Sequence, residues 1–271
     1  MGAVKPKKFL GQHFLKDLDI ARKIADTLDD FAGIPVIEVG PGMGVLTQYL
    51  IEKEHDLTVV EIDRDSVPYL HEHYPKLRGN IIEGDFLQMK LTDIYTDKFC
   101  VIGNYPYNIS SQIFFKVLEY KDHIPCCSGM LQKEVAERIA SAPGKKAYGI
   151  LSVLLQVWYD IEYLFTVSED VFDPPPKVKS AVIRLVRNKR QKMECNERLF
   201  KTVVKTSFNH RRKTLRNSMK PLLGKDNEIY SDIIFNKRPE QLSVEDFVYL
   251  TSLTEKYMPA GAENAGIRRK E

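Results

Sequence analysis

An asparagine, a proline and an aromatic ring follow an apolar run near the middle of this 271-residue chain. The run covers residues 99–103 and reads as a buried strand, so Asn104, Pro106 and Tyr107 are expected at its carboxyl end. Alkylation of the exocyclic amine of a nucleobase requires acceptors for the amine hydrogens and a flat surface for the extruded base. Asn104 can supply the acceptor and Tyr107 the surface. Because Asn and Pro are also common in turns, this interpretation depends on the surrounding sequence.

A glycine-rich turn follows an earlier predicted strand, at residues 38–44 (EVGPGMG). Glycines there let the backbone approach a ligand closely, and the next helix directs its amide groups at the same place. A dinucleotide fingerprint would carry its third glycine where this chain has Val45, which disfavours a nicotinamide-dependent enzyme. The spacing instead resembles the glycine loop of S-adenosylmethionine-dependent methyltransferases.

Two acidic residues end the next two predicted strands, Glu61 after residues 57–60 and Asp85 after residues 81–84. A carboxylate at Glu61 can accept hydrogens from both ribose hydroxyls, and Asp85 can accept one from the adenine amine of a cofactor. The carboxyl ends of successive parallel strands meet at the crevice where open α/β sheets bind ligands. We therefore expect the glycine loop and both acids to form one nucleoside site.

These residues must be positioned by strands and helices, which are predicted to alternate along the chain up to about residue 186. An amphipathic helix opens the fold over residues 18–28, and residues 149–158 read as a buried helix. Residues 161–166 and 180–186 can close the sheet as a hairpin-like pair. Strand-like runs lie at residues 35–39, 57–61, 81–85, 99–103 and 126–131, separated by segments long enough for crossover helices. The fold class predicted is α/β, a mainly parallel Rossmann-like sheet with a small C-terminal helical domain.

Composition and length fit two domains of a globular protein, with 43% hydrophobic and 28% charged residues. We predict a catalytic domain over residues 1–190, a small helical domain over 191–258 and a disordered tail over 259–271. No apolar stretch is long enough to span a membrane, and residues 1–8 do not begin a secretory signal. The four cysteines and six histidines lack metal-ligand spacing, so we expect no metal, and cytoplasmic localisation.

Positive charge is concentrated in one segment. Residues 187–221 contain twelve Lys or Arg but only two acids, which gives +10 there and −7 over the rest of the chain. A solvated helix face is the simpler explanation of most basic runs. Here the density of cations favours a surface that binds nucleic acid.

Five motifs together resemble the ribosomal small-subunit RNA adenine dimethyltransferases, in addition to the glycine loop. The similarity extends from Lys7 to about Leu250, and the last motif is the most specific to this family. The motifs are residues 9–15 (FLGQHFL), 104–110 (NYPYNIS), 148–153 (YGILSV), 172–178 (FDPPPKV) and 208–217 (FNHRRKTLRN). The chain departs from the family at His13, where Asn is common, and at Tyr105, where Leu, Ile or Pro is common.

The resemblance implies transfer of two methyl groups from S-adenosylmethionine to each of two adjacent adenines in the 3′-terminal hairpin loop of small-subunit ribosomal RNA. Its implied partners are that RNA and the immature small ribosomal subunit, with no membrane partner, and a monomer is expected. The cofactor residues carried over are His13, Leu15, Gly40, Glu61, Asp85 and Asn104. The catalytic residues are Asn104, Tyr107 and Phe172, with Tyr107 and Phe172 stacking on opposite faces of the base. The RNA-binding residues are Arg211, Arg212, Lys213 and Arg216.

Two other functions remain open at this point. An adenine methyltransferase acting on DNA or on large-subunit RNA can use the same Asn-x-Pro-Tyr chemistry, and substrate competition separates it. A non-catalytic assembly factor can bind nucleic acid through the same basic domain, although intact Glu61, Asp85, Asn104 and Tyr107 argue against it.

Overall fold

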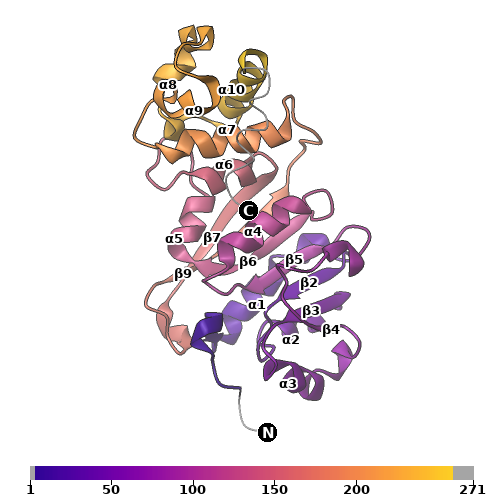
Figure 1. Ribbon diagram of the computed structural model, residues 1–271. Coiled ribbons are helices and arrows are strands. Elements are labelled where there is room, and N and C mark those ends of the chain that lie inside the picture. The colour runs from indigo at the N-terminus through magenta and orange to yellow at the C-terminus, as the bar shows by residue number, and fades with distance from the viewer. Residues whose placement is uncertain (1–3, 259–271) are drawn as a thin grey trace. The chain divides into compact units, whose positions relative to one another are not determined.

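Seven strands form one sheet in the computed structural model, which describes residues 4–258 (Figure 1). The order across the sheet is β4-β3-β2-β5-β6-β9-β7. The five parallel strands are β2 (Val36–Val39), β3 (Leu57–Glu61), β4 (Ile81–Glu83), β5 (Cys100–Asn104) and β6 (Cys126–Gln132). The antiparallel pair β9 (Ser180–Arg187) and β7 (Tyr159–Val167) completes the sheet. The predicted α/β class, parallel strands and closing pair are confirmed.

The strand order reverses between β2 and β5, because the chain goes from β2 to β3 and β4 on one side and from β5 to β6 on the other. Open α/β sheets bind ligands at such a switch point, outside the carboxyl ends of the strands. The glycine loop after β2 and Asn104 at the end of β5 therefore meet at this edge.

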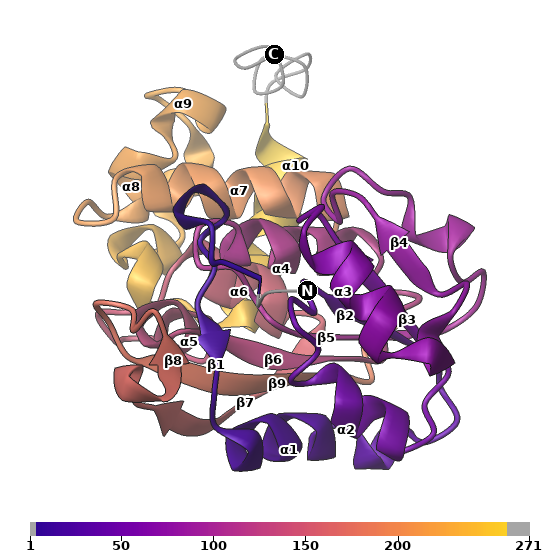
Figure 2. The ribbon, with the colours of Figure 1, turned by 90° about the horizontal axis from the view of Figure 1, so that it is seen from below.

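Helices cover both faces of the sheet. In Figure 2, α1 and α2 lie on one face and α4 on the other. The predicted first helix forms because Ala21, Ile24 and Ala25 share one buried side, and the Asp17 carboxylate caps its start by accepting from Ile20 N (3.0 Å). The helices of this part are α1 (Leu18–Asp26), α2 (Thr47–Glu52), α3 (Ser66–His73), α4 (Ser110–Glu119) and α5 (Lys133–Ile139).

A second, two-stranded sheet fastens the start of the chain to a distant segment. β1 (Phe14–Leu15) pairs antiparallel with β8 (Phe172–Asp173), so that Leu15 lies opposite Phe172. Both side chains are buried in the same hydrophobic core cluster. Neither strand was predicted, since two residues are too few to carry a periodic pattern.

The described chain divides into two compact units. The first contains residues 4–137 and 159–187, and the second contains residues 138–158 and 188–258. The helical unit thus begins close to the predicted boundary at residue 190, but it also includes residues 138–158, which the sequence pattern did not assign to it. Whether the units act as separate catalytic and RNA-binding domains stays a prediction. The predicted tail, residues 259–271, lies outside the described residues.

Within the helical unit, the segment 138–158 packs on the later helices. Gly144 N donates to Glu240 O (2.7 Å), and the rings of Tyr148 and Phe208 meet edge to face. Leu215, Met219 and Leu222 recur at helical spacing but belong to two short helices, because Pro221 has no amide hydrogen and occupies the first turn of α9. The helices are α6 (Ile150–Gln156), α7 (Glu197–Asn209), α8 (Leu215–Ser218), α9 (Lys220–Leu223) and α10 (Val244–Tyr257).

Short 3-10 helices connect these elements in both units. They are η1 (Lys8–Leu10), η2 (Asp29–Phe31), η3 (Pro75–Leu77), η4 (Leu91–Asp93), η5 (Glu169–Val171), η6 (Glu228–Ser231), η7 (Ile233–Asn236) and η8 (Pro239–Gln241). Over residues 4–258, every helix is too short or too polar to cross a lipid bilayer.

Candidate active site

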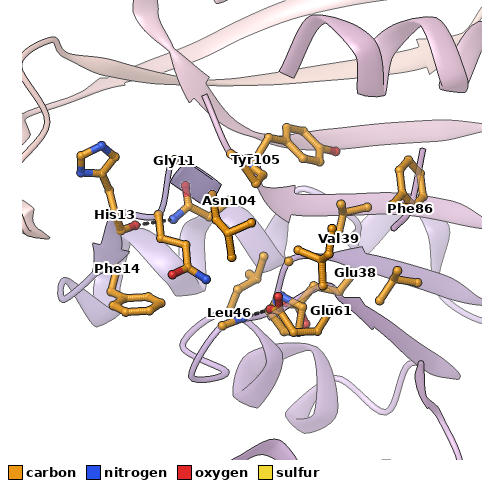
Figure 3. A pocket seen from close by; sticks show the side chains of 18 of the residues that line it. Gly11, His13, Phe14, Glu38, Val39, Leu46, Glu61, Phe86, Asn104 and Tyr105 are labelled. Atoms are coloured by element: carbon orange, nitrogen blue, oxygen red, sulfur yellow. Dashed lines mark hydrogen bonds between the residues drawn. The ribbon is translucent and has the colours of Figure 1, made fainter. Parts of the chain in front are cut away.

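A pocket opens at the switch point, along the carboxyl edge of β2, β3, β4 and β5 (Figure 3). Its walls come from the glycine loop, the ends of β3 and β5, the turn after β4 and the arm formed by residues 7–15. The lining residues include His13, Leu15, Gly40, Glu61, Asp85, Asn104 and Tyr107, together with Glu38, Phe86 and the arm residues Leu10, Gly11 and Gln12. Every residue that the resemblance assigned to the cofactor is therefore at this pocket.

The glycine loop needs its glycines for two different reasons. Gly40 has a φ of 67°, a left-handed conformation that L side chains rarely adopt, and it faces the pocket. Gly44 also has a positive φ, but a Cβ there would lie 2.3 Å from the Tyr74 ring, whose hydroxyl donates to Gly44 O (3.0 Å). Gly44 is thus required for packing, whereas Gly40 leaves the backbone open to a ligand.

Glu61 ends β3 with its carboxylate buried beside the glycine loop. One carboxylate oxygen accepts from Gly42 N (2.9 Å) and the other from Asp63 N (2.8 Å). Burial raises the pKa of Glu61, and the bonds from these backbone amides partly offset this effect. A carboxylate has about four lone-pair positions, so Glu61 keeps acceptor capacity for a ligand hydroxyl beside these main-chain bonds.

Glu38 is a site residue that the sequence argument quoted in the glycine motif but did not assign. It lies one residue before the end of β2 and is only 1% exposed. Burial raises the pKa of Glu38 to about 8, against the opposing effect of a hydrogen bond from Thr47 Oγ1 (2.7 Å). The signal that could have found it is an acid inside an otherwise apolar strand, where a charge must have a partner.

Asp85 and Leu15 border the pocket in different ways. The expected strand 81–85 ends at Glu83, so Asp85 belongs to the following turn, where its carboxylate accepts from Leu87 N (2.9 Å). Leu15 is a buried residue of β1 and presents only apolar surface. Asp85 thus brings a polar group to the wall formed by the turn after β4, whereas Leu15, at the end of the arm, packs into the hydrophobic core.

Asn104 is held by the arm at the end of β5. Its Nδ2 donates to the His13 carbonyl oxygen (3.2 Å), which fixes the orientation of the amide (Figure 3). Among the described residues, no hydrogen bond occupies Asn104 Oδ1. The amide therefore turns its acceptor away from the arm and leaves it available.

The Tyr105 side chain points away from the pocket and into the sheet (Figure 3). It is 1% exposed, and its hydroxyl donates to Ser128 O (2.7 Å). Gly129 makes room for it, since a Cβ there would lie 2.7 Å from the ring. The family departure at Tyr105 thus leaves only the main chain of this residue at the pocket.

Tyr107 and Phe172 differ in their availability. Tyr107 is partly exposed, and its hydroxyl shares a hydrogen bond with the Ser180 hydroxyl. Phe172 is fully buried in the core and is not among the residues that line the pocket. The stacking role predicted for Phe172 has no support from this geometry and stays a prediction.

The arm over the pocket is attached by charge. Asp63, just beyond β3, has a fully buried side chain that forms an ion pair with Lys7 and accepts from Gln12 Nε2 (2.9 Å). Lys7 also reaches Asp65, which is exposed (2.7 Å). Residues 10–15 of the arm line the pocket, and the contacts with Asp63 hold the beginning of the arm in place.

Of the four predicted RNA-binding residues, Arg211, Arg212 and Lys213 lie in the turn after α7, and Arg216 lies in α8 of the helical unit. Two have structural partners: Arg211 donates to Glu240 (2.7 Å), and Arg216 donates to Tyr230 O (2.6 Å). Arg212 and Lys213 are exposed, and the structure records no hydrogen bond or ion pair of their side chains with any described residue.

Within residues 4–258, no three His, Cys, Asp or Glu side chains are grouped so that they could hold a metal ion.

A mainly parallel sheet with a glycine loop after β2, an acid at the end of β3 and a pocket at the switch point defines the class of Rossmann-like S-adenosylmethionine-dependent methyltransferases. A family model described as "Ribosomal RNA adenine dimethylase" matches residues 3–256. The chain belongs to this family.

Individual relatives agree with this assignment. The chain is 70% identical over 258 residues to the ribosomal RNA small subunit methyltransferase A of Parabacteroides distasonis, covering 95% of this chain and 97% of that one. The protein of the same name from Bacteroides thetaiotaomicron is 66% identical, with coverages of 94% and 96%.

Two solved structures resemble the fold. A dimethyladenosine transferase from Plasmodium falciparum has a TM-score of 0.75 at 24% identity, covering 90% of this chain and 98% of that one. The 23S rRNA methyltransferase ErmE has a TM-score of 0.66 at 25% identity, with coverages of 88% and 99%. The cofactor of this class, S-adenosylmethionine, is that of the present chain.

Proposed function

We propose that the protein dimethylates the N6 amines of two adjacent adenines in the 3′-terminal hairpin loop of small-subunit ribosomal RNA. The family assignment and relatives of 60–70% identity along nearly the whole chain support the enzyme class and the small-subunit RNA substrate. The observation that carries the chemistry is Asn104, which stands at the end of β5 with its amide oriented by the His13 carbonyl.

The donor set at the pocket fits a sulfonium nucleoside. We assign the ribose hydroxyls to the Glu61 carboxylate and the adenine amine of the cofactor to Asp85. Gly40 offers an open backbone, Leu15 an apolar wall, and the main chain of His13 an edge shared with Asn104. When bound, S-adenosylmethionine supplies an electrophilic methyl group.

The role of the chain's own residues is to orient the acceptor amine. Adenine's exocyclic nitrogen is a weak nucleophile because its lone pair is delocalised into the ring. Hydrogen bonds from the amine to Asn104 Oδ1 and the Tyr105 carbonyl favour a pyramidal nitrogen whose lone pair faces the methyl group. Positioning of this kind accounts for much of the acceleration of a displacement. Stacking on Tyr107 holds the base, and we keep Phe172 as the hypothesis for its other face.

RNA phosphates are assigned to the basic segment of the helical unit. Arg212 and Lys213 are the better candidates, because their exposed side chains can turn to phosphates without breaking a recorded bond. Arg211 and Arg216 support the same segment through Glu240 and Tyr230. We further propose that the substrate is the immature small subunit and that the protein acts on it as a monomer in the cytoplasm.

The test uses radiolabelled S-adenosylmethionine and immature small subunits from cells that lack the activity. After incubation, the RNA is digested and the labelled nucleoside is identified and mapped. We expect N6,N6-dimethyladenosine in the 3′-terminal hairpin.

A parallel reaction on large-subunit RNA tests the alternative to which the structural similarity with ErmE draws attention. Label in that RNA, with none in the small subunit, would show that the proposed substrate is wrong. If no RNA is labelled although the cofactor binds, we would conclude that the protein is a non-catalytic assembly factor.

A further inference from the structure

The His13 side chain lies apart from the cofactor wall. Its carbonyl turns towards Asn104, whereas its imidazole extends to the other side, away from Glu38 and Glu61 (Figure 3). The main chain and the side chain of His13 therefore face different parts of the site.

Two contacts fix the imidazole. Its ring stacks on Tyr107, with the centroids 5.3 Å apart and the planes inclined by 29°. Its Nδ1 lies 2.7 Å from the carbonyl oxygen of Pro174, and because a carbonyl can only accept, Nδ1 carries the hydrogen. His13 thus connects the ring of Tyr107 to the segment that follows β8.

The Tyr107 hydroxyl makes one side-chain hydrogen bond within the described residues. This bond is with Ser180, and a hydroxyl contact at one end allows the ring to turn about its long axis. A flat neighbour on one face removes that freedom and leaves the opposite face for a base. Two flat groups in contact also have a preferred stacking geometry.

We propose that the His13 side chain is a positioning residue for the target adenine, which acts by holding the Tyr107 ring as the stacking surface. This inference rests on the proposed function and deepens it. It separates His13 from the cofactor ligands: the carbonyl orients Asn104, and the imidazole serves the RNA side of the reaction.

The test is a double-mutant cycle with His13→Ala and Tyr107→Leu, assayed on immature small subunits. His13→Ala should lower kcat roughly 10-fold, as expected for a lost ring contact that orients a reactant, with the cofactor Kd unchanged. In the Tyr107→Leu background the same change should have little further effect, because the residue it positions is gone. His13→Phe, which keeps a flat ring but loses the bond to Pro174, should recover most of the kcat lost in His13→Ala.

Two results would overturn the proposal. Weaker cofactor binding that accounts for the whole loss would make the imidazole a cofactor ligand. Additive losses in the cycle, or no loss in His13→Ala, would remove the link to Tyr107. If His13→Ala fails to fold, the cycle is run with His13→Asn, which keeps a hydrogen-bond donor but no ring. The wild-type protein in the same assay tests the proposed function separately. If the wild type does not methylate the RNA, both the proposed function and this inference are overturned. If it does, the differences between the variants decide the inference alone.

Discussion

Asn104 and Glu61 are held by main-chain groups that also form the site. The Asn104 amide donates to the His13 carbonyl, and the Glu61 carboxylate accepts from Gly42 and Asp63. Side chains fixed in this way need little reorganisation when a ligand arrives, which is the condition for electrostatic and positional catalysis.

Replacing Asn104 by Ala should remove the acceptor for the adenine amine. We expect kcat to fall by roughly 100-fold or more, with cofactor binding largely intact. The measurement is single-turnover methylation beside equilibrium cofactor binding. Asn104→Asp is the matched variant: it keeps an acceptor but loses the donor to His13, so it should retain more activity than Ala. Equal loss of binding and turnover in Asn104→Ala would assign the residue a structural role.

Glu38 should make folding stability depend on pH. Its pKa is raised from 4.5 to about 8, so between these values the folded protein binds the proton that the unfolded chain releases. The free energy of unfolding therefore decreases as pH rises through this window, by at most about 1.4 kcal/mol per pH unit from this group.

Glu38→Gln stays neutral and can still accept from Thr47, so its stability should change less over the same range. Urea unfolding of both proteins at pH 5 and pH 8.5 isolates the contribution of Glu38, because the histidines are common to both. Parallel pH profiles would mean that Glu38 is ionised in the folded protein.

At the scale of elements, alternating apolar runs and glycine turns predicted the parallel strands, their closing pair and the first helix. These patterns can be read from the local sequence, because a buried strand requires a run of apolar residues. The pairing of β1 with β8 was not predictable, because it joins residues about 160 positions apart through two-residue strands. Separation along the chain also hid the contacts of His13 with Tyr107, 94 positions away, and with Pro174, 161 positions away. Phe172 illustrates the converse: its motif indicated the site, but only tertiary packing reveals that its ring is buried.

The ion pair between Lys7 and Asp63 should keep the arm closed over the cofactor. Lys7→Ala leaves a buried carboxylate without its cation, so we expect the cofactor to dissociate roughly 3- to 10-fold faster, as for a lost interaction of about 1 kcal/mol. Stopped-flow displacement of bound cofactor measures the rate. Lys8→Ala is the control, since Lys8 is an exposed neighbour on the same arm. Equal rates in both variants would mean that the arm does not limit release.

Acid should release the same arm. Burial alone would raise the pKa of Asp63, but hydrogen bonds from Lys7, Gln12 and Asp65 N outweigh burial and the pKa is lowered. The stability from this carboxylate is therefore present above its ordinary pKa of 3.8 and is lost as pH falls through the lower value of the folded state.

At the scale of the whole molecule, the basic segment 187–221 carries +10 within a chain of net charge +3. Sequence predicted this polarity but could not separate cations that bind RNA from cations that hold the helical unit together. The structure separates Arg211 and Arg216, which have internal partners, from the exposed Arg212 and Lys213, and RNA binding by the latter two stays a prediction.

Arg212→Glu combined with Lys213→Glu should weaken RNA binding and reduce its dependence on salt. Each lost phosphate contact lowers the slope of log affinity against log salt by about 0.9 for duplex RNA treated like B-DNA. Titrations at several salt concentrations measure the slope, with Lys256→Glu on α10 as the control for a charge reversal outside the basic segment. Arg211→Ala should instead lower thermal stability, because Glu240 loses its partner. An unchanged slope in the double variant would make the segment a solvated surface.

The helical unit is discontinuous in the chain, since residues 138–158 belong to it together with residues 188–258. During synthesis the first of these segments leaves the ribosome well before α7 and α10 exist. All strands of the sheet have been synthesised once the chain reaches Arg187. Tyr148 and the apolar side of α6 are made before Phe208 and the later helices that pack on them. A protein that we propose acts on newly made small subunits therefore has an exposed apolar segment of its own during synthesis, until the last part of its chain has been translated.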